Sequence, residues 1–489
     1  MLFNSFEFAL FLPIVFVLYW FVFQRNLKIQ NALIVLASYT FYGWWDWRFL
    51  SLIFISSVAD FVIGQQLHKS EEEGRRKLFL TMSLVINLGF LGFFKYYNFF
   101  TDSFVDAFTM FGMQMNRSSL NIILPVGISF YTFQTLSYTI DIYRRQLEPT
   151  KDAVAFFAFV SFFPQLVAGP IERAVNLLPQ FHVTRKFDYA KARDGVRQIF
   201  WGLFKKIVIA DTCANNVNII FENSETMGGS ALWIGALFFA FQIYGDFSGY
   251  SDIAIGTARL FGFGLMQNFA TPYFSRDIGE FWRRWHISLS TWFRDYVYIP
   301  MGGSRVGKWR QFWNIIVTFT VSGFWHGANW TFIIWGFLNG LYYMPIMIFN
   351  LKDKNRPKVV AMGKWFPNVK EIFQVGTTFL LTLIAWVFFR AKSVTEAVQY
   401  IGGMFSASVF SNPAHSFKGY SMRDSVIYAM LAILTLVLIE WFQREKAHGL
   451  EVDEKKAAAI RWVSYSAILV LVILFRQTGG NLDFIYFQF

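Results

Sequence analysis

Charge, cysteine and histidine are scarce in this sequence, and each scarcity excludes a class of protein. Charged residues make up 16% of the 489 residues, against roughly 25% in soluble domains, so water is not the main environment of the chain. The single cysteine, Cys213, excludes an intramolecular disulfide and a multi-cysteine zinc site. The six histidines form no HxxxH, HxxHH or HExxH pairing, so we expect no metal and no resident cofactor. They are His68, His182, His286, His326, His415 and His448.

Long apolar runs, by contrast, are abundant. Hydrophobic residues make up 55% of the chain, and phenylalanine alone occurs 61 times. About 20 consecutive apolar residues are enough to cross a bilayer as a helix, and no strand-like alternation of the barrel type is present. The sequence therefore predicts an all-α polytopic membrane protein, with apolar runs at 6–23, 31–47, 50–67, 78–100, 121–140, 152–170, 194–212, 229–258, 312–350, 372–389, 425–443 and 459–475.

Two of these runs depart from a simple crossing. Between Gln311 and Lys352 there is no Asp, Glu, Lys or Arg, which is length enough for roughly two crossings. The run 152–170 contains "FFPQLVAGP", whose proline and glycine residues end a helix inside the membrane. Such a break is tolerated where protein or water satisfies the freed backbone groups. We expect 152–170 to re-enter the membrane without crossing it.

The distribution of basic residues predicts the orientation. Lys and Arg concentrate in the loops after the first, third and fifth runs, whereas the loop after the fourth has only Arg117. Because cytoplasmic loops carry the excess of basic residues, we expect a multi-pass protein with an extracytoplasmic N-terminus. The first run follows no basic region, so it is predicted to be a retained helix and not a cleaved signal. Beyond residue 150 the basic residues leave the topology ambiguous.

The whole chain is interpreted as a single integral membrane domain, 1–489. No soluble domain, internal repeat or low-complexity linker is visible. The charged segments 351–371 and 443–461 are interpreted as connecting loops or surface helices. The net charge of +12 suits loops beside an anionic leaflet. The sequence has no basic stripe on a soluble module, so it does not indicate nucleic-acid binding. The lipid bilayer is the partner that the composition requires.

Polar residues inside apolar runs are costly, so they indicate function or specific packing. The stretch "QIYGDFSGYSDIAIG", 242–256, places Gln242, Asp246 and Asp252 in such a run. Gly245 and Gly249 have the small-xxx-small spacing that allows helices to approach closely. The aspartates either act directly at a site or shape it, or they mark a helix break where each pairs with an arginine.

His326 lies in "SGFWHGANW", 322–330, and is the one histidine in a run without other charge. On a continuous helix its neighbours three and four positions away would be Ser322, Gly323, Asn329 and Trp330. A membrane histidine of this kind is a functional candidate; the alternative is a core histidine bonded to a carbonyl. We include Trp325 and Asn329 among the candidate site residues.

A second histidine, His286, lies in "FWRRWHISLSTWFRDYVYIPMGGSR", 281–305. If this stretch is helical, Trp282, His286 and Ser290 share one face. It is either an interfacial amphipathic helix whose arginines meet lipid phosphates, or an anion-binding entrance that leads to the two histidines. The charged candidates in this stretch are Arg283, Arg284, Arg294 and Asp295.

Acyl transfer fits these residues best. A match to GxxxxGK at Gly302–Lys308 is followed by Trp309, so the Ser or Thr that a phosphate-binding loop places on Mg²⁺ is missing. Acyl transfer needs a base that takes the proton of an acceptor hydroxyl and donors that stabilise the oxyanion, with no metal. A shielded imidazole serves as that base near neutral pH. Basic residues at the cytoplasmic mouth would hold the phosphates of a coenzyme A thioester.

Taken in order, these stretches resemble the membrane-bound O-acyltransferase (MBOAT) superfamily. They are "QIYGDFSGYSDIAIG", "FWRRWHISLSTWFRDYVYIPMGGSR" and "SGFWHGANWTFIIWG". More narrowly, they resemble the bacterial branch that contains the alginate O-acetyltransferase membrane component. Two further stretches also resemble this branch: "ILPVGISFYTFQTLSYTIDIYR" and "FFPQLVAGPIERA". The motifs are dense over about 120–345, and the helices of 346–489 are less diagnostic. The resemblance implies about eleven transmembrane helices, with re-entrant or interfacial helices and a central tunnel.

The resemblance also implies roles for residues. The histidine that matches His326 is catalytic in such proteins, and the one that matches His286 is its polar partner. Arg283, Arg284 and Arg294 are then candidates for donor binding or gating. The family moves an acyl group from a cytoplasmic donor toward the outer face. In the alginate-type branch the group passes to a hydrolase-like (SGNH-type) extracytoplasmic transferase that modifies a polysaccharide. The expected donor is acetyl-CoA, and the expected location is a bacterial inner membrane.

Two alternatives stay open. The first is transfer of D-alanine to teichoic acid by a related acyltransferase that an acyl-carrier protein supplies. The second is a transporter for a lipid-linked sugar, which would explain intramembrane aspartates and broken helices without chemistry. The absence of paired repeat halves weakens the second.

Overall fold

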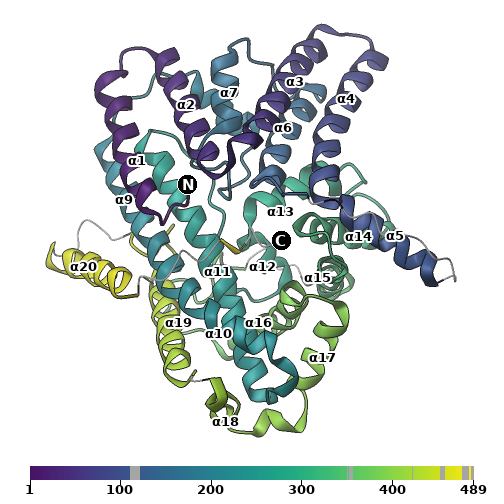
Figure 1. Cartoon of the computed structure of the whole chain (residues 1–489), viewed down its shortest axis with the longest axis vertical. Coiled ribbons are helices and arrows are strands. Elements are labelled where there is room, and N and C mark those ends of the chain that lie inside the picture. Colours follow the sequence, from purple (N-terminus) through teal and green to yellow (C-terminus); the bar gives the residue numbers. More distant parts are fainter. Residues whose placement is uncertain are drawn as a thin grey trace. The chain divides into compact units, whose positions relative to one another are not determined.

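A computed structural model describes residues 1–110, 120, 122–349, 351, 356–420, 422–451, 458–475 and 484–485. Arg117, used above to predict the orientation, lies outside this part of the chain. Within the described residues the fold is helical, without strands, as predicted. The α-helices, labelled in Figure 1 where there is room, are α1 (Phe6–Val17), α2 (Leu27–Asp46), α3 (Leu50–Lys69), α4 (Glu73–Leu91), α5 (Tyr97–Met110), α6 (Ile128–Tyr143), α7 (Ala153–Ser161), α8 (Ala174–Leu177), α9 (Tyr189–Leu203), α10 (Asp211–Glu222), α11 (Gly229–Leu260), α12 (Ile278–Arg284), α13 (Ile287–Phe293), α14 (Lys308–His326), α15 (Trp330–Ile348), α16 (Val369–Arg390), α17 (Val394–Met404), α18 (Pro413–Phe417), α19 (Arg423–Gln443) and α20 (Ala458–Phe475).

The chain forms two compact units. One consists of Met1–Val196 and Ala254–Met266, and the other of Arg197–Ile253 and Gln267–Phe489. The boundaries between the units fall within α9 and α11. Both predicted histidines belong to the second unit, so the candidate site is built within that unit alone.

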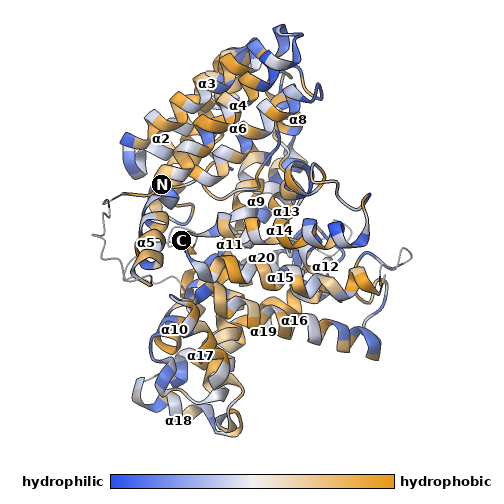
Figure 2. Ribbon diagram, turned by 90° about the vertical axis from the view of Figure 1, so that its right-hand side faces the viewer, coloured by the Kyte–Doolittle hydropathy of each residue, from blue (hydrophilic) through white to orange (hydrophobic). Residues whose placement is uncertain are grey.

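Six helical segments among the described residues are long and apolar enough to cross a membrane: Leu27–Lys69, Glu73–Met110, Gly229–Leu260, Trp330–Ile348, Val369–Arg390 and Arg423–Gln443. Large apolar side chains stay exposed on them, such as Phe54 and Val62 of α3, as expected for a surface in contact with lipid tails. Figure 2 shows hydrophobic residues along α3 and α4 and hydrophilic ones at the loop that joins them. The chain is a multi-pass membrane protein; the count of about eleven spans stays a prediction.

In the first unit, α3, α4 and α6 pack together around buried polar groups. Asp60 of α3 is fully buried and accepts hydrogen bonds from Ser83 Oγ (2.6 Å) and Asn87 Nδ2 (2.8 Å), both on α4. Thr135 of α6 donates to Asn87 Oδ1 at 3.1 Å. Polar contacts of this kind join helices where no water satisfies polar groups. The sequence analysis did not single out Asp60.

The predicted break within 152–170 is confirmed. Helix α7 ends at Ser161, and irregular turns follow through Gly169. Neighbouring side chains satisfy the freed backbone groups: Phe163 N–H donates to Ser38 Oγ (3.0 Å), and Gln134 Nε2 donates to the Phe159 carbonyl (2.6 Å). Both contacts lie within the first unit. That this segment re-enters the membrane without crossing it stays a prediction.

The uncharged run 312–350 forms two helices, as its length predicted. Helix α14 ends at His326 and α15 begins at Trp330, with Asn329 as its N-cap, whose side chain accepts from Thr331 N–H at 3.0 Å. The two helices pack closely through glycines, because a Cβ on Gly323 would lie 3.0 Å from the Gly336 Cα. Gly323 and Gly336 thus allow the two helices to approach closely.

Candidate active site

The chain turns sharply at His286. Helix α12 ends at Arg284, Trp285 is extended, and His286 has a left-handed backbone (φ 43°, ψ 55°). Such a backbone is uncommon for a residue with a side chain and is often found at functional sites. The conditional prediction of one helix that places Trp282, His286 and Ser290 on a single face is therefore wrong.

The segment 268–270 explains this turn. Ala270 N–H donates to the Arg284 carbonyl at 3.0 Å, and Ile287 N–H donates to the Asn268 carbonyl at 2.9 Å. These bonds cannot form if α12 and α13 are one continuous helix, because a helix uses the same backbone groups internally. No proline or glycine marks the turn in the sequence, so local residue preferences do not reveal it.

Asn268 fixes the tautomer of His286. Asn268 Oδ1 accepts from Ser288 N–H (3.2 Å) and Ser288 Oγ (2.9 Å), and it lies 3.1 Å from His286 Nδ1. The backbone N–H identifies this atom as the amide oxygen, so Nδ1 donates and carries the hydrogen. Asn268 Nδ2 in turn donates to Ser251 Oγ at 3.0 Å. In the neutral ring, Nε2 is then the nitrogen with a lone pair.

The ring of His286 is completely buried. His286 lies outside the six candidate membrane spans. Burial lowers the pKa of His286 to about 3, since removal from water disfavours the charged form. His286 is therefore neutral at physiological pH, and its Nε2 lone pair can accept a hydrogen bond.

His326, at the end of α14, lies close to His286. The centres of the two rings are 6.4 Å apart. Aromatic residues surround His326, with Trp335 at 5.1 Å and Phe389 at 5.4 Å between ring centres. Trp325 lies near both histidines, 5.0 Å from His326 and 6.2 Å from His286. The structure thus brings His286 together with Trp325 and His326, two adjacent residues that are far from it in the sequence.

The side chain of Asn329 stabilises the start of a helix. Its side chain caps α15 and donates to the Lys392 carbonyl at 3.0 Å. The expectation that Asn329 and Trp330 lie beside His326 on one helix is wrong, because α14 ends at His326 and the chain is extended at Gly327.

The two intramembrane aspartates pair with lysines, and the alternative of arginine partners is wrong. Asp246 lies 2.8 Å from Lys206 Nζ, and Asp252 lies 2.5 Å from Lys205 Nζ. Buried charges need such partners. The lysines come close because α11 packs tightly on residues 202–210: a Cβ on Gly249 would lie 2.7 Å from the Gly202 carbonyl oxygen. The close packing predicted for Gly249 is confirmed. Gln242 is buried in the same helix.

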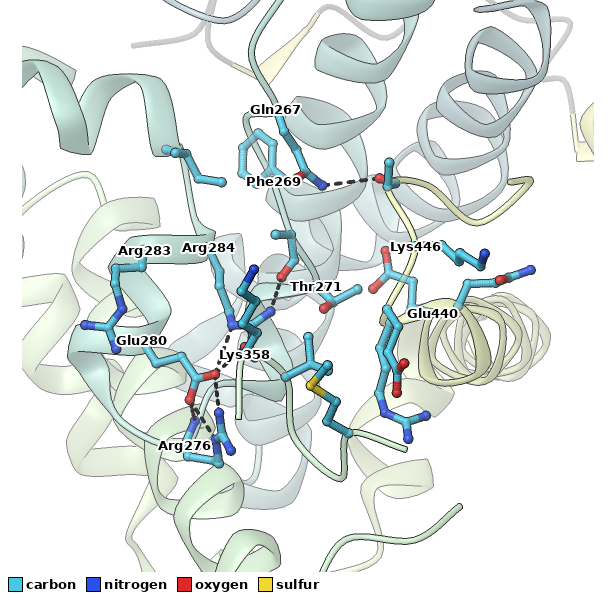
Figure 3. A pocket seen from close by; sticks show the side chains of 18 of the residues that line it. Gln267, Phe269, Thr271, Arg276, Glu280, Arg283, Arg284, Lys358, Glu440 and Lys446 are labelled. Carbon is cyan, nitrogen blue, oxygen red and sulfur yellow. Dashed lines mark hydrogen bonds and ion pairs between the residues drawn. The ribbon is translucent and has the colours of Figure 1, made fainter. Parts of the chain in front are cut away.

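A cavity of about 860 Å³ opens in the second unit (Figure 3). Eight cationic and five anionic side chains line it, so its net formal charge is +3. The cations are Lys205, Arg276, Arg283, Arg284, Arg356, Lys358, Arg444 and Lys446, and the anions are Asp252, Asp277, Glu280, Glu440 and Glu445. An excess of positive charge in an enclosed space favours an anionic ligand such as a phosphate.

Glu280 of α12 holds two of the cavity arginines. Arg276 Nε lies 2.9 Å and Arg284 Nη2 lies 3.0 Å from its carboxylate oxygens, as the dashed lines in Figure 3 show. Burial alone would raise the pKa of Glu280, but hydrogen bonds from Arg276 and the charge of Arg284 lower it below its ordinary value. Glu280 therefore remains ionised and fixes both guanidinium groups.

The predicted arginines divide into two groups. Arg283 and Arg284 line the cavity. Arg294 is bound to its neighbour Asp295 at 2.6 Å, its side chain is 57% exposed, and neither residue lines the cavity. The structure therefore brings Arg283 and Arg284, but not Arg294 and Asp295, to the cationic cavity.

Neither His286 nor His326 lines the cavity, although Ile287 and Phe269 do. The ring of Phe269 is nearly parallel to that of His286, with centres 6.3 Å apart. Phe269 also packs edge-on against Phe247 (5.0 Å) and Trp285 (5.1 Å). Phe269 thus lines the cavity and also packs on the ring of His286. The tunnel through the histidines stays a prediction.

Several residues of this site could not be recognised from the sequence. Asn268 and Phe269 lie in "MQNFATPYFS", which has no pattern of its own, and Glu440 lies in an ordinary apolar run. Glu440 accepts a hydrogen bond from Tyr244 at 2.5 Å on the cavity wall. Lys205 also lines the cavity and was not among the predicted site residues. A signal was available there, since two adjacent lysines inside an apolar run require carboxylate partners.

The sequence profile of MBOAT, the membrane-bound O-acyltransferase family, matches residues 90–385, more than half of the chain. The chain belongs to the membrane-bound O-acyltransferase family. It is a membrane-embedded acyltransferase, as the resemblance predicted. A protein named "Probable alginate O-acetylase AlgI" from Pseudomonas putida is 37% identical over 506 residues, which cover 100% of both chains. The "Peptidoglycan O-acetyltransferase" of Helicobacter pylori is 32% identical over 100% of this chain and 98% of its own. The "Teichoic acid D-alanyltransferase" of Streptococcus thermophilus is 30% identical over 46% of this chain and 56% of its own.

Proposed function

We propose that this MBOAT protein moves an acetyl group from cytoplasmic acetyl-CoA across a bacterial inner membrane. The acetyl group then passes to an extracytoplasmic hydrolase-like transferase of the SGNH type, which O-acetylates an exported or cell-surface polysaccharide. Relatives that align over the whole chain support this, since they are named for acetylation of alginate or peptidoglycan. The N-terminus is taken to lie outside, as the basic loops indicate.

The observation that carries the proposal is the pair of adjacent buried histidines beside a cationic cavity within one unit. His326 acts as general base and takes the proton of the acceptor hydroxyl. The hydroxyl oxygen bonds to the thioester carbonyl carbon, the carbon–sulfur bond breaks, and the proton passes to the departing thiolate. No atom or electron from another reactant is needed for this balance.

The tautomer of His286 decides between its two candidate roles. Its Nδ1–H is directed at Asn268 Oδ1, so Nε2 has no hydrogen to donate. This favours a role in which His286 Nε2 accepts a hydrogen bond and aids His326, over one in which it donates a hydrogen bond to the acyl carbonyl.

The cavity supports a coenzyme A donor. Arg283, Arg356, Lys358 and the other cations of its wall give the cavity an excess of positive charge, which suits the phosphates of a small soluble thioester. Transfer of D-alanine from a carrier protein is the second candidate. The partial match to a teichoic acid D-alanyltransferase favours it, but that match covers less of both chains than the matches to the acetyltransferases do. Family membership removes the sugar transporter from consideration.

A reconstitution tests these donors. Wild-type protein is placed in sealed liposomes with radiolabelled acetyl-CoA inside and the candidate outer transferase outside, and label on the transferase is counted. The proposal predicts label from acetyl-CoA and none from D-alanyl carrier protein. Label from the carrier donor alone would contradict it and favour the second candidate; label from neither would overturn both.

A further inference from the structure

We infer that Phe269 limits the length of the acyl group that reaches the histidines. This inference rests on the proposed transfer from a thioester donor, and it adds a specificity-determining residue to that site. The starting point is that Phe269 lines the cavity and packs on the ring of His286, whereas His286 itself does not line the cavity.

The ring of Phe269 contacts both the cavity and His286. It is 9% exposed. Its other sides pack against Phe247, Trp285 and His286, with ring centres 5.0, 5.1 and 6.3 Å away. A thioester that enters from the cavity side therefore meets this ring before it meets the imidazole. Only a small acyl group fits beside a closely packed aromatic ring, because protein interiors leave few voids.

The backbone around Phe269 is fixed by hydrogen bonds, so a substitution of Phe269 changes the side chain without moving the backbone. Gln267 Nε2 donates to the Ala447 carbonyl at 3.2 Å, and Ala270 N–H donates to the Arg284 carbonyl at 3.0 Å. Asn268, between them, is bonded to Ser251 and Ser288. Figure 3 shows Gln267 and Phe269 together at this edge of the cavity. Truncation of the ring would therefore widen the path while the anchors stay in place.

The predicted effect is on the choice of donor. Each extra methylene in a tight apolar site is discriminated by roughly 10-fold or more. The wild-type protein should therefore use acetyl-CoA at least about 100-fold better than butyryl-CoA, which is two methylenes longer. Phe269→Ala should lower this ratio by about 10-fold or more, and Phe269→Leu should give an intermediate value.

The control is Phe281→Ala. Phe281 is also buried and stacks on Trp285 at 5.6 Å, but it does not line the cavity. The measurement is kcat/KM for acetyl-CoA divided by kcat/KM for butyryl-CoA, with transfer to the outer partner as readout. The fraction of folded protein cancels in this ratio, so a purely structural defect does not change it.

The outcomes separate the two claims. A lower ratio in Phe269→Ala and Phe269→Leu, with an unchanged ratio in Phe281→Ala, supports the inference. Wild-type transfer with the same ratio in all variants overturns the inference and leaves the proposed function intact. Absence of transfer by the wild-type protein from any acyl-CoA overturns the proposed function itself.

Discussion

At the scale of residues, the contact between Asn268 and His286 matters most for the chemistry. The backbone N–H of Ser288 identifies the atom near Nδ1 as an oxygen. The hydrogen on the imidazole is thereby assigned to Nδ1, and the ring is held in one orientation. In acyl transfer a fixed tautomer is worth a large factor in rate, since only one nitrogen faces the reacting proton.

Substitution of Asn268 tests this assignment. Asn268→Ala removes the acceptor that holds Nδ1–H, so the ring loses its fixed tautomer. We expect kcat to fall by roughly 10-fold or more with little change in the KM for the donor, measured in the reconstituted transfer assay. Asn314→Ala is the control: Asn314 is also buried in the second unit, but its side chain donates to the Met301 and Gly303 carbonyls and not to a histidine contact. Equal losses in the two variants would contradict the assignment.

The burial of His286 also predicts a pH effect on stability. Its pKa is about 3 in the folded protein, against an ordinary value of 6.5. Between these values the unfolded chain binds a proton that the folded protein does not, so folding is favoured above pH 6.5 and weakened as pH falls. The loss from pH 6.5 to pH 5 is about 2 kcal/mol.

His286→Gln removes this titration. In detergent, the Tm of the wild-type protein should fall more between pH 7 and pH 5 than the Tm of the variant. An equal decrease in both proteins would show that His286 is protonated, or already exposed, in the folded state.

The residues that the sequence revealed are those whose polarity conflicts with their surroundings. His326 stands in a run without charge, and Asp246 and Asp252 stand in an apolar helix, so each was a candidate before the structure. Asn268 and Phe269 were not, because an amide and an aromatic ring in a short irregular segment conflict with nothing. Their importance depends on contacts with residues distant in the sequence, which local patterns do not contain.

At the scale of elements, the packing of α11 on residues 202–210 places the buried ion pairs. Gly245 and Gly249 allow the approach, since Cβ atoms there would lie 2.8 and 2.7 Å from the carbonyl oxygens of Lys205 and Gly202. The glycine spacing predicted this contact. The turn at His286 was not predictable in the same way, because bonds from the segment 268–270 impose it on residues that would otherwise continue a helix.

Glycine substitutions test the packing of α11. Gly249→Ala forces a methyl group against the Gly202 carbonyl, so we expect a lower Tm and a lower yield of folded protein. Gly376→Ala, in the middle of α16, is the matched control, because no atom lies within 4 Å of the added Cβ. Alanine is favoured over glycine inside a helix by roughly 1 kcal/mol, so this variant should be neutral or more stable. A decrease of the same size in both would contradict the close contact.

At the scale of the whole molecule, composition was enough to predict a helical membrane protein, and ordered motifs were enough to predict its family. The cavity could not be predicted from the sequence. Its cations come partly from the charged segments 351–371 and 443–461, expected to be only connecting loops or surface helices, which supply Arg356, Lys358, Arg444 and Lys446. Only the tertiary fold of the second unit brings these segments to α12.

The central claim is that His326 is the base for acyl transfer across the membrane, and one measurement tests it directly. Sealed liposomes hold labelled acetyl-CoA inside and the outer transferase outside, and the rate of labelling is compared for wild type, His326→Ala and His415→Ala. His415 lies exposed in α18 and serves as the control. The account predicts a loss of roughly 100-fold or more for His326→Ala and none for His415→Ala. Labelling by His326→Ala at the wild-type rate would contradict it.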